Sequence, residues 1–238
     1  MQNSFVDLLS YLAIIFPAFL LAFTIRGFFK AWVAKLMGDD TAQDEGFLTL
    51  NPIVHINFFG LSIGLFVLVI VGGLLLGGFP RSLLFIFLVL LGVRWKNPVP
   101  INESKFKNYS LGVILTTLAP SFGNFILALL FLYVFKYFPF VLLPGYAILS
   151  LGELFNAVIE LSIFFGVLDL IPIPPFDGGR LLEFVLPKSC HNVIAWLHNY
   201  SIYIVLALFV LPGISNLFFR FLSIICFFVK LGLLFLVF

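Results

Sequence analysis

The sequence predicts an all-α polytopic membrane protein, and three observations lead to this class. Of the 238 residues, 62% are hydrophobic, only 10% are charged, and the mean hydropathy is +1.19. Soluble domains are about 45–50% apolar and about 25% charged. The apolar residues gather in runs close to the about 20 residues that a helix needs to cross the hydrocarbon core. Because lipid cannot satisfy an open backbone, we expect these runs to be helical.

We predict about six transmembrane helices in a single membrane domain, residues 1–238. A sixth span is expected around residues 201–211, whereas the run 83–93 is too short to assign. The chain begins without a basic leader or a small-residue cleavage pattern, so we expect the first run to be retained as a span. Five runs are long enough to cross the membrane by themselves: 5–25, 58–79, 111–135, 141–171 and 216–238.

Charge and cysteine content limit the kinds of partner and site that we expect. The formal net charge is only +2 and the basic residues are scattered, so we expect no nucleic acid partner. Cys190 and Cys226 are isolated, which predicts neither a disulfide framework nor a cysteine metal site. The expected partner is the lipid bilayer. The basic residues of the segment 94–107 favour a cytoplasmic position for that loop.

Three polar segments separate the apolar runs. Segment 39–57 has short alternation and an Asn-Pro turn pair, which predict a small strand or β-hairpin at the membrane surface. Two prolines limit segment 94–102 to an edge strand or extended loop. In segment 168–180, Pro172 and two further prolines cannot continue a helix. Irregular backbone beside membrane helices requires surrounding protein or a water-filled cavity, so this last loop is the leading candidate for a functional cavity.

Four ordered blocks carry a family resemblance. The blocks "AFTIRGFFKAWVAKLMGDDTAQDEGFLTLNPIVHIN", "KNPVPIN", "LAPSFGNFILALL" and "LDLIPIPPFDGGRLL" resemble the compact bacterial branch of the site-2 protease family of intramembrane zinc metalloproteases. The resemblance implies a site-2-protease-like core at 20–190, followed by C-terminal helices at 191–238. It also implies a multi-pass protein of the bacterial cytoplasmic membrane. In the family, two histidines of a His-Glu-x-x-His helix and the Asp of a downstream Asp-Gly motif bind zinc, and the Glu is the general base.

The matched positions depart from this catalytic pattern. The first His, the Glu and the second His of the motif fall on Arg26, Gly27 and Lys30, whereas Asp177 matches the third ligand. Two histidines four residues apart on a helix can bind one zinc ion, but guanidinium and ammonium groups offer no lone pair. Glycine cannot act as a base. Because a catalytic zinc normally has three protein ligands, we expect no cofactor in this chain, although zinc is the cofactor of the family.

The sequence therefore predicts a proteolytically inactive homologue that binds transmembrane segments of client proteins. An active intramembrane zinc metalloprotease with altered ligands is the alternative, which leaves open whether the chain is an enzyme. A small-solute or proton pathway built from intramembrane charges is a third hypothesis.

The substitutions suggest an exchange of charges at the former metal position. The family usually has Asn where this chain has Asp169, so an acid is gained together with two bases. Charges inside a membrane are costly and generally pair. We therefore expect Arg26 or Lys30 to face Asp169 and Asp177 in an ion-pair cluster. The alternative for Lys30 is that its long side chain reaches the membrane interface.

Further polar residues mark a possible groove, which we assign to Asn124, Pro172 and Glu160. Glu160 forms one helical stripe with Glu153 and Asn156, which either lines a water path, binds Lys30 or marks the surface end of a span. The three histidines are expected to be structural or interfacial rather than metal ligands, because none has a partner at the i, i+3 or i+4 spacing; they are His55, His191 and His198.

Overall fold

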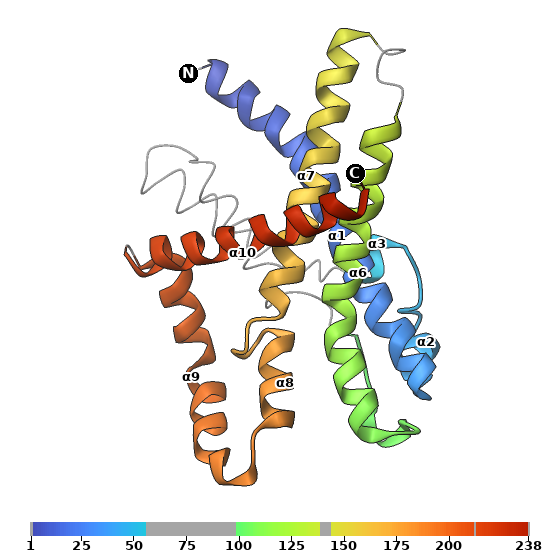
Figure 1. Cartoon of the computed structure of the whole chain (residues 1–238), viewed down its shortest axis with the longest axis vertical. Helices are drawn as coiled ribbons and strands as arrows, with labels where there is room; N and C mark the ends of the chain where they lie inside the picture. The colour runs from blue at the N-terminus through green and yellow to red at the C-terminus, as the bar shows by residue number, and fades with distance from the viewer. Residues whose placement is uncertain (1, 56–98, 139–143, 212, 238) are drawn as a thin grey trace.

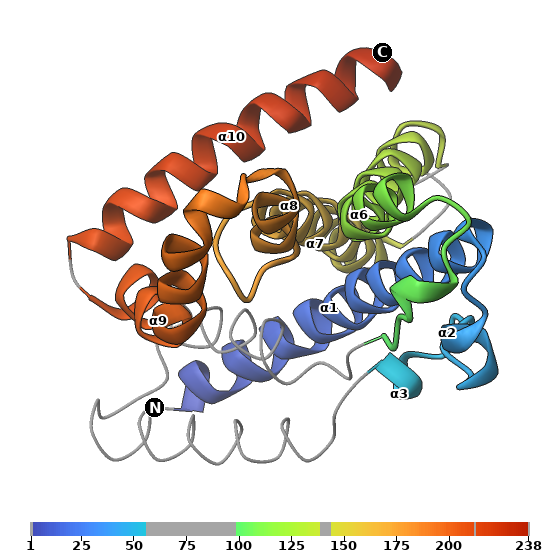
Figure 2. The ribbon, with the colours of Figure 1, turned by 90° about the horizontal axis from the view of Figure 1, so that it is seen from below.

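Long helices dominate the computed structural model, which describes residues 2–55, 99–138, 144–211 and 213–237. Helices α1 (Gln2–Met37), α6 (Tyr109–Tyr137) and α7 (Gly145–Asp169) pack against one another in the centre of the molecule (Figure 1). Viewed from below, α6 and α7 lie between α1 on one side and α10 (Ile214–Val237) on the other (Figure 2). This bundle positions the candidate site described below.

Shorter elements surround the bundle. Helix α8 (Asp177–Val185) follows α7, and α9 (His191–Val210) lies beside it before the chain turns into α10. Figure 1 shows α10 crossing the bundle at a steep angle to α7. The remaining elements are single turns that connect the long helices: α2 (Thr41–Asp44), α3 (Pro52–His55), η2 (Glu103–Lys105) and η4 (Lys188–Cys190).

Within the described residues, four helical segments are long and apolar enough to cross a membrane: Ala13–Met37, Tyr109–Tyr137, Ser150–Asp169 and Ile214–Val237. A fifth is possible if Asn192–Ser201 and Tyr203–Phe209, which meet at 63°, form one bent span. The chain is therefore a multi-pass membrane protein. The count of about six is not confirmed, because the predicted span 58–79 and the run 83–93 lie outside the described residues.

The first span differs from its predicted position. We placed it at residues 5–25, but the candidate segment continues to Met37. Hydropathy falls at Arg26 and Lys30, which made the span seem to end there. The helix continues because both side chains find carboxylate partners inside the protein instead of requiring water.

The predicted surface β-elements are not confirmed. Described residues 39–55 form α2, α3 and turns, and residues 99–102 form no strand. Local hydrogen bonds explain the turns, because the side chains of Asp39 and Asn51 accept bonds from backbone N–H groups two residues later. Such bonds offer the backbone an alternative to a strand ladder.

Asp39 anchors the end of α1 to the segment before α6. Its side chain is fully buried and accepts hydrogen bonds from the backbone N–H groups of Thr41 at 3.1 Å and Asn102 at 2.7 Å, and from the Thr41 hydroxyl. Burial alone raises the pKa of Asp39, but these bonds outweigh it and hold the pKa below its usual value. The carboxylate therefore ties together two segments more than sixty residues apart.

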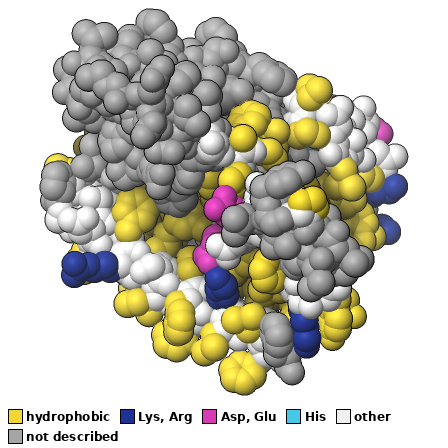
Figure 3. All heavy atoms as spheres, turned by 90° about the horizontal axis from the view of Figure 1, so that it is seen from above, with side chains coloured by type: hydrophobic (Ala, Val, Ile, Leu, Met, Phe, Trp, Pro, Cys, Tyr) yellow, Lys and Arg dark blue, Asp and Glu magenta, His cyan; other side chains and the backbone are white. Residues whose placement is uncertain are grey.

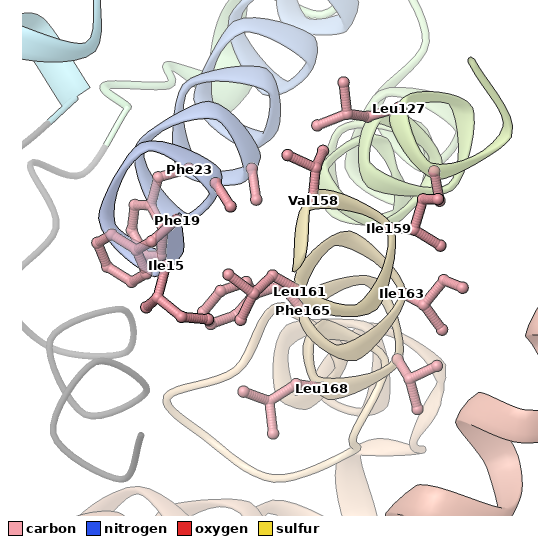
Figure 4. Close-up of a cluster of buried hydrophobic side chains, with 14 of the residues drawn as sticks. Ile15, Phe19, Phe23, Leu127, Val158, Ile159, Leu161, Ile163, Phe165 and Leu168 are labelled. Carbon is pink, nitrogen blue, oxygen red and sulfur yellow. The ribbon is translucent and has the colours of Figure 1, made fainter. Parts of the chain in front are cut away.

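Aromatic side chains fill the centre of the bundle. Phe19 and Phe23 of α1 belong to the same buried cluster as Phe165 of α7, part of which Figure 4 shows. The Phe165 ring lies edge-on to both, with centroid distances of 5.8 Å to Phe19 and 5.5 Å to Phe23. Edge-to-face pairs contribute about 0.5–1.5 kcal/mol beyond area burial. This packing fixes α1 against α7 one helical turn before Arg26.

Candidate functional site

The candidate site is a buried ion-pair cluster formed by Arg26, Lys30, Asp169 and Asp177. An Nη atom of Arg26 contacts Oδ1 of Asp169 and lies 3.0 Å from Oδ2 of Asp177. Nζ of Lys30 lies 2.5 Å from the other carboxylate oxygen of Asp177. The structure thus brings together all four residues for which the sequence suggested a charge exchange.

Helical spacing allows one face of α1 to supply both cations. Arg26 and Lys30 are four residues apart, so their side chains project from the same face. This is the geometry by which two histidines at these positions would reach one metal ion. Here the same projection carries a guanidinium and an ammonium group onto shared carboxylates. The Arg26 guanidinium also lies 5.7 Å from the centre of the Phe23 ring, within the range of a cation–π contact.

The two carboxylates come from the ends of neighbouring helices. Asp169 is the last residue of α7, and Asp177 is the first residue of α8. The positive end of the helix dipole of α8 favours a carboxylate at Asp177, whereas the negative end of α7 disfavours one at Asp169. Asp169 therefore depends more strongly on Arg26 for its charge to be tolerated.

A close backbone approach holds Asp177 in place. A Cβ on Gly178 would lie only 2.5 Å from the carbonyl oxygens of Leu170 and Ile171. The first turn of α8 thus packs directly against the loop that leaves α7, which only glycine permits. The prolines of this loop end α7 at Asp169, as expected from their missing N–H groups.

Solvent contributes little to the cluster. Side-chain exposure is 7% for Arg26, 1% for Asp169, 8% for Asp177 and 12% for Lys30. Two cations and two carboxylates give the group a net charge of zero. Neutrality makes burial tolerable, since an unpaired charge at this depth would cost several kcal/mol.

The third altered motif position, Gly27, accommodates His55. A Cβ at Gly27 would lie 2.3 Å from Nδ1 of His55, so the imidazole occupies the space that a side chain at position 27 would need. Nε2 of His55 lies 2.9 Å from the Thr49 carbonyl oxygen, which fits an N–H donor at that nitrogen. Burial lowers the pKa of His55, partly offset by this hydrogen bond. The neutral ring therefore packs where the family carries its catalytic Glu.

The donor set at this position does not fit a catalytic zinc ion. Both oxygens of Asp177, the one matched ligand, contact a cation from α1. The described residues contain no group of three or more His, Cys, Asp or Glu side chains arranged to hold a metal ion. Guanidinium and ammonium groups beside a carboxylate satisfy its lone pairs and repel a metal cation.

Of the residues assigned to a groove, Glu160 lines the pocket described below, whereas Asn124 and Pro172 are not among its lining residues. Asn124 is fully buried in α6, and neither of its side-chain polar atoms has a hydrogen-bond partner in the part of the chain that the structure describes. Pro172 is exposed on the loop between α7 and α8. Glu160 lines a separate pocket with Glu153 and Asn156, away from Lys30.

Several charged contacts outside the cluster were missed at the sequence level, among them two that join pairs of helices. Lys230 of α10 pairs with Glu160 of α7, and His198 of α9 contacts Glu183 of α8. The only available signal for Lys230 was its isolation in an apolar span, where a charge usually has a partner. His198 thus lies at a helix contact, whereas the side chain of His191 is outside the described part.

The long apolar helices make the chain a multi-pass membrane protein, and comparison of its sequence with known proteins finds two homologues of the site-2 protease type, which confirms the resemblance found in the sequence. One relative is "Putative zinc metalloprotease YwhC" of Bacillus subtilis (strain 168), which is 29% identical over 214 residues, or 87% of this chain and 83% of the relative. Another is "Putative zinc metalloprotease Rip2" of Mycolicibacterium smegmatis (strain ATCC 700084 / mc(2)155), which is 27% identical over 216 residues, or 89% of this chain and 73% of the relative. No family model matches the chain, and no solved structure matches it.

Proposed function

We propose that this protein is a proteolytically inactive homologue of site-2 proteases that binds transmembrane segments of client proteins in the bacterial cytoplasmic membrane. The observation that carries the proposal is the neutral cluster at the motif positions, in which Arg26 and Lys30 face Asp169 and Asp177. These contacts supply the electrostatic role that a metal ion would have toward Asp177, without its Lewis acidity.

The chemistry of hydrolysis lacks two components in this arrangement. A water nucleophile must be activated by a metal ion or by a base within hydrogen-bond reach. Position 27 has no side chain, and the cations at positions 26 and 30 cannot accept a proton while they are paired with carboxylates. His55 next to Gly27 donates from Nε2 to Thr49 and lies 3% exposed, which leaves little access for water.

Client binding is supported by the exposed loop beside the cluster. Leu170 is 41% exposed and Pro172 is exposed, although both lie within a few residues of the buried Asp169. The loop packs closely against the backbone of Gly178 in the first turn of α8. A preorganised apolar edge at the membrane is suited to contact another transmembrane helix, since such contacts rely on close packing.

Site-specific photo-crosslinking tests the client contact. A benzophenone amino acid placed at Leu170 should form adducts that map to transmembrane segments of single-span proteins in native membranes. The matched control position is Phe235 on α10, which is also exposed, at 79%. Two results would argue against a specific client site. Protein adducts could form equally often from both positions, or the probe at Leu170 could form adducts with lipid alone.

The second candidate function is proteolysis with altered ligands. It is favoured by the retained Asp177 and by the names of the two relatives. An active protease would bind about one zinc ion per chain and cleave a transmembrane substrate in a chelator-sensitive manner. The third hypothesis, a small-solute or proton pathway, requires uptake into liposomes that is lost in Glu160→Gln or Asp169→Asn.

A further inference from the structure

A pocket of about 920 Å³ opens between α1, α7 and α10, away from the ion-pair cluster. Apolar side chains form most of its wall, including Ala157 and Phe164, and Ser223 of α10 faces them. Glu153, Glu160 and Lys230 are its charged lining residues. On the face shown in Figure 3, acidic and basic side chains lie together among hydrophobic ones.

The charges in this pocket are unequally matched. Lys230 pairs with Glu160, which lies near the middle of the candidate span Ser150–Asp169. Glu153 is exposed and has no ion-pair partner among the described residues. Two carboxylates and one ammonium leave a net charge of −1 in the lining. An ammonium group of a ligand would give Glu153 a cationic partner.

The position of Glu153 along α7 indicates where that charge would lie. Glu153 and Glu160 both lie inside α7, which begins at Gly145, and the seven residues between them correspond to about 10.5 Å along the helix. Glu160 and the apolar side chain of Phe164 line the pocket further along α7 than Glu153 does. A ligand with a cationic head at Glu153 and an apolar tail along α7 would match this order of lining residues.

The pocket volume favours a small amphiphile over a protein helix. A transmembrane helix about 30 Å long and about 10 Å wide occupies roughly 2,400 Å³. The pocket offers about 920 Å³, which is within the range of about 300–1,000 Å³ typical of small-molecule sites. A single-tailed amine or one chain of a lipid is of suitable size.

We propose that this pocket binds an amphiphile with a primary amine head and an apolar tail, with the ammonium paired to Glu153. The amine comes either from an ethanolamine lipid headgroup or from a free long-chain amine, which share this chemistry. The inference concerns a different surface from the client contact at Leu170 and does not depend on the proposed function.

Native mass spectrometry of the detergent-purified full chain tests the proposal. The probes are dodecylamine against dodecanol, and dioleoyl-phosphatidylethanolamine against dioleoyl-phosphatidylglycerol with the same tails. In at least one of the two comparisons, we expect the amine probe to be retained roughly fivefold more than the probe without an amine. An ion pair at an exposed site allows a difference of this size. Retention of only the lipid amine, or only the free amine, identifies the source and supports the proposal. Equal retention within both pairs overturns it.

Variants locate the binding. Glu153→Gln should lower amine retention roughly fivefold and leave dodecanol retention unchanged. The matched control is Glu45→Gln, an exposed Glu at the end of α2 outside the pocket, which should behave as wild type. Ala157→Trp should block the tail and reduce all retention. If that variant does not fold, as judged by size-exclusion chromatography, Ser223→Phe fills the pocket from α10. Wild-type amine preference in Glu153→Gln, or undiminished retention in the folded blocking variant, overturns the proposal.

Discussion

Replacing Arg26 by Met should strongly destabilise the protein. The wild-type cluster is neutral, because Arg26 and Lys30 balance Asp169 and Asp177. Arg26→Met preserves much of the side-chain volume but leaves a net charge of −1 in a site where Asp169 is 1% exposed. Breaking a buried pair by removing one partner costs about 3–5 kcal/mol. Loss of the contact with Phe23 adds about 0.5–1 kcal/mol.

The double variant Arg26→Met with Asp169→Asn separates pairing from packing. It restores neutrality, since Lys30 and Asp177 remain paired. We expect it to lose only about 1–3 kcal/mol, because the uncompensated charge has gone and only packing and hydrogen bonds are altered. The coupling energy between the two positions should therefore be at least about 2 kcal/mol.

Reversible unfolding in mixed detergent micelles, followed by circular dichroism, gives the free energies of unfolding for the four proteins of this cycle. Arg220→Met on α10 is the matched control, because Arg220 is exposed, and it should change stability by less than about 0.5 kcal/mol. Losses that simply add in the double variant would refute the pairing. So would an Arg26→Met effect no larger than that of the control.

Three further outcomes are expected. Gly27→Ala should destabilise the protein by about 1–3 kcal/mol, because its Cβ would meet His55 at 2.3 Å, and His55→Ala in the same chain should relieve much of this loss in a thermal unfolding assay. Asp39→Asn should cost about 1–2 kcal/mol at pH 7. Because the folded pKa of Asp39 is lowered, its stabilisation is complete above the unfolded pKa of about 3.9 and disappears as the pH falls through the folded value. The two stability curves should therefore converge in acid, and a pH-independent gap would contradict the assigned hydrogen bonds. Lys230→Met should loosen α10, because Glu160 loses the cation that pairs with it. Limited proteolysis should then cut the C-terminal region faster than in wild type, whereas the control Lys107→Met, at an exposed position, should leave the rate unchanged.

The ion-pair cluster could be anticipated from the sequence because its geometry follows from local rules. Residues 26 and 30 share a helix face by spacing alone, and the motif order brings a downstream Asp to that face. The acid at position 169, where the family usually has Asn, then provides a second carboxylate that can balance a second cation. Which oxygen each cation contacts could not be predicted, since this depends on how the turn of α8 packs through Gly178.

Other features depended on tertiary structure that the sequence pattern does not encode. Hydropathy placed the first span at residues 5–25, because it cannot register that Arg26 and Lys30 are neutralised by residues far along the chain. The pairing of Lys230 with Glu160 depends on the angle at which α10 crosses α7. The surface hairpin predicted in residues 39–57 is not confirmed, and in the described part, 39–55, hydrogen bonds accepted by the side chains of Asp39 and Asn51 stabilise turns.

Metal content tests the central claim most directly, namely that an ion-pair cluster stands where the family holds zinc. The full chain would be purified in detergent from zinc-supplemented cells, and bound zinc would be counted by inductively coupled plasma mass spectrometry, with Asp177→Asn as the matched control. We expect wild type and control to carry the same zinc, far below one ion per chain, because the motif offers one carboxylate already bound by two cations. About one tightly bound zinc ion per wild-type chain, lost in Asp177→Asn, would contradict the claim.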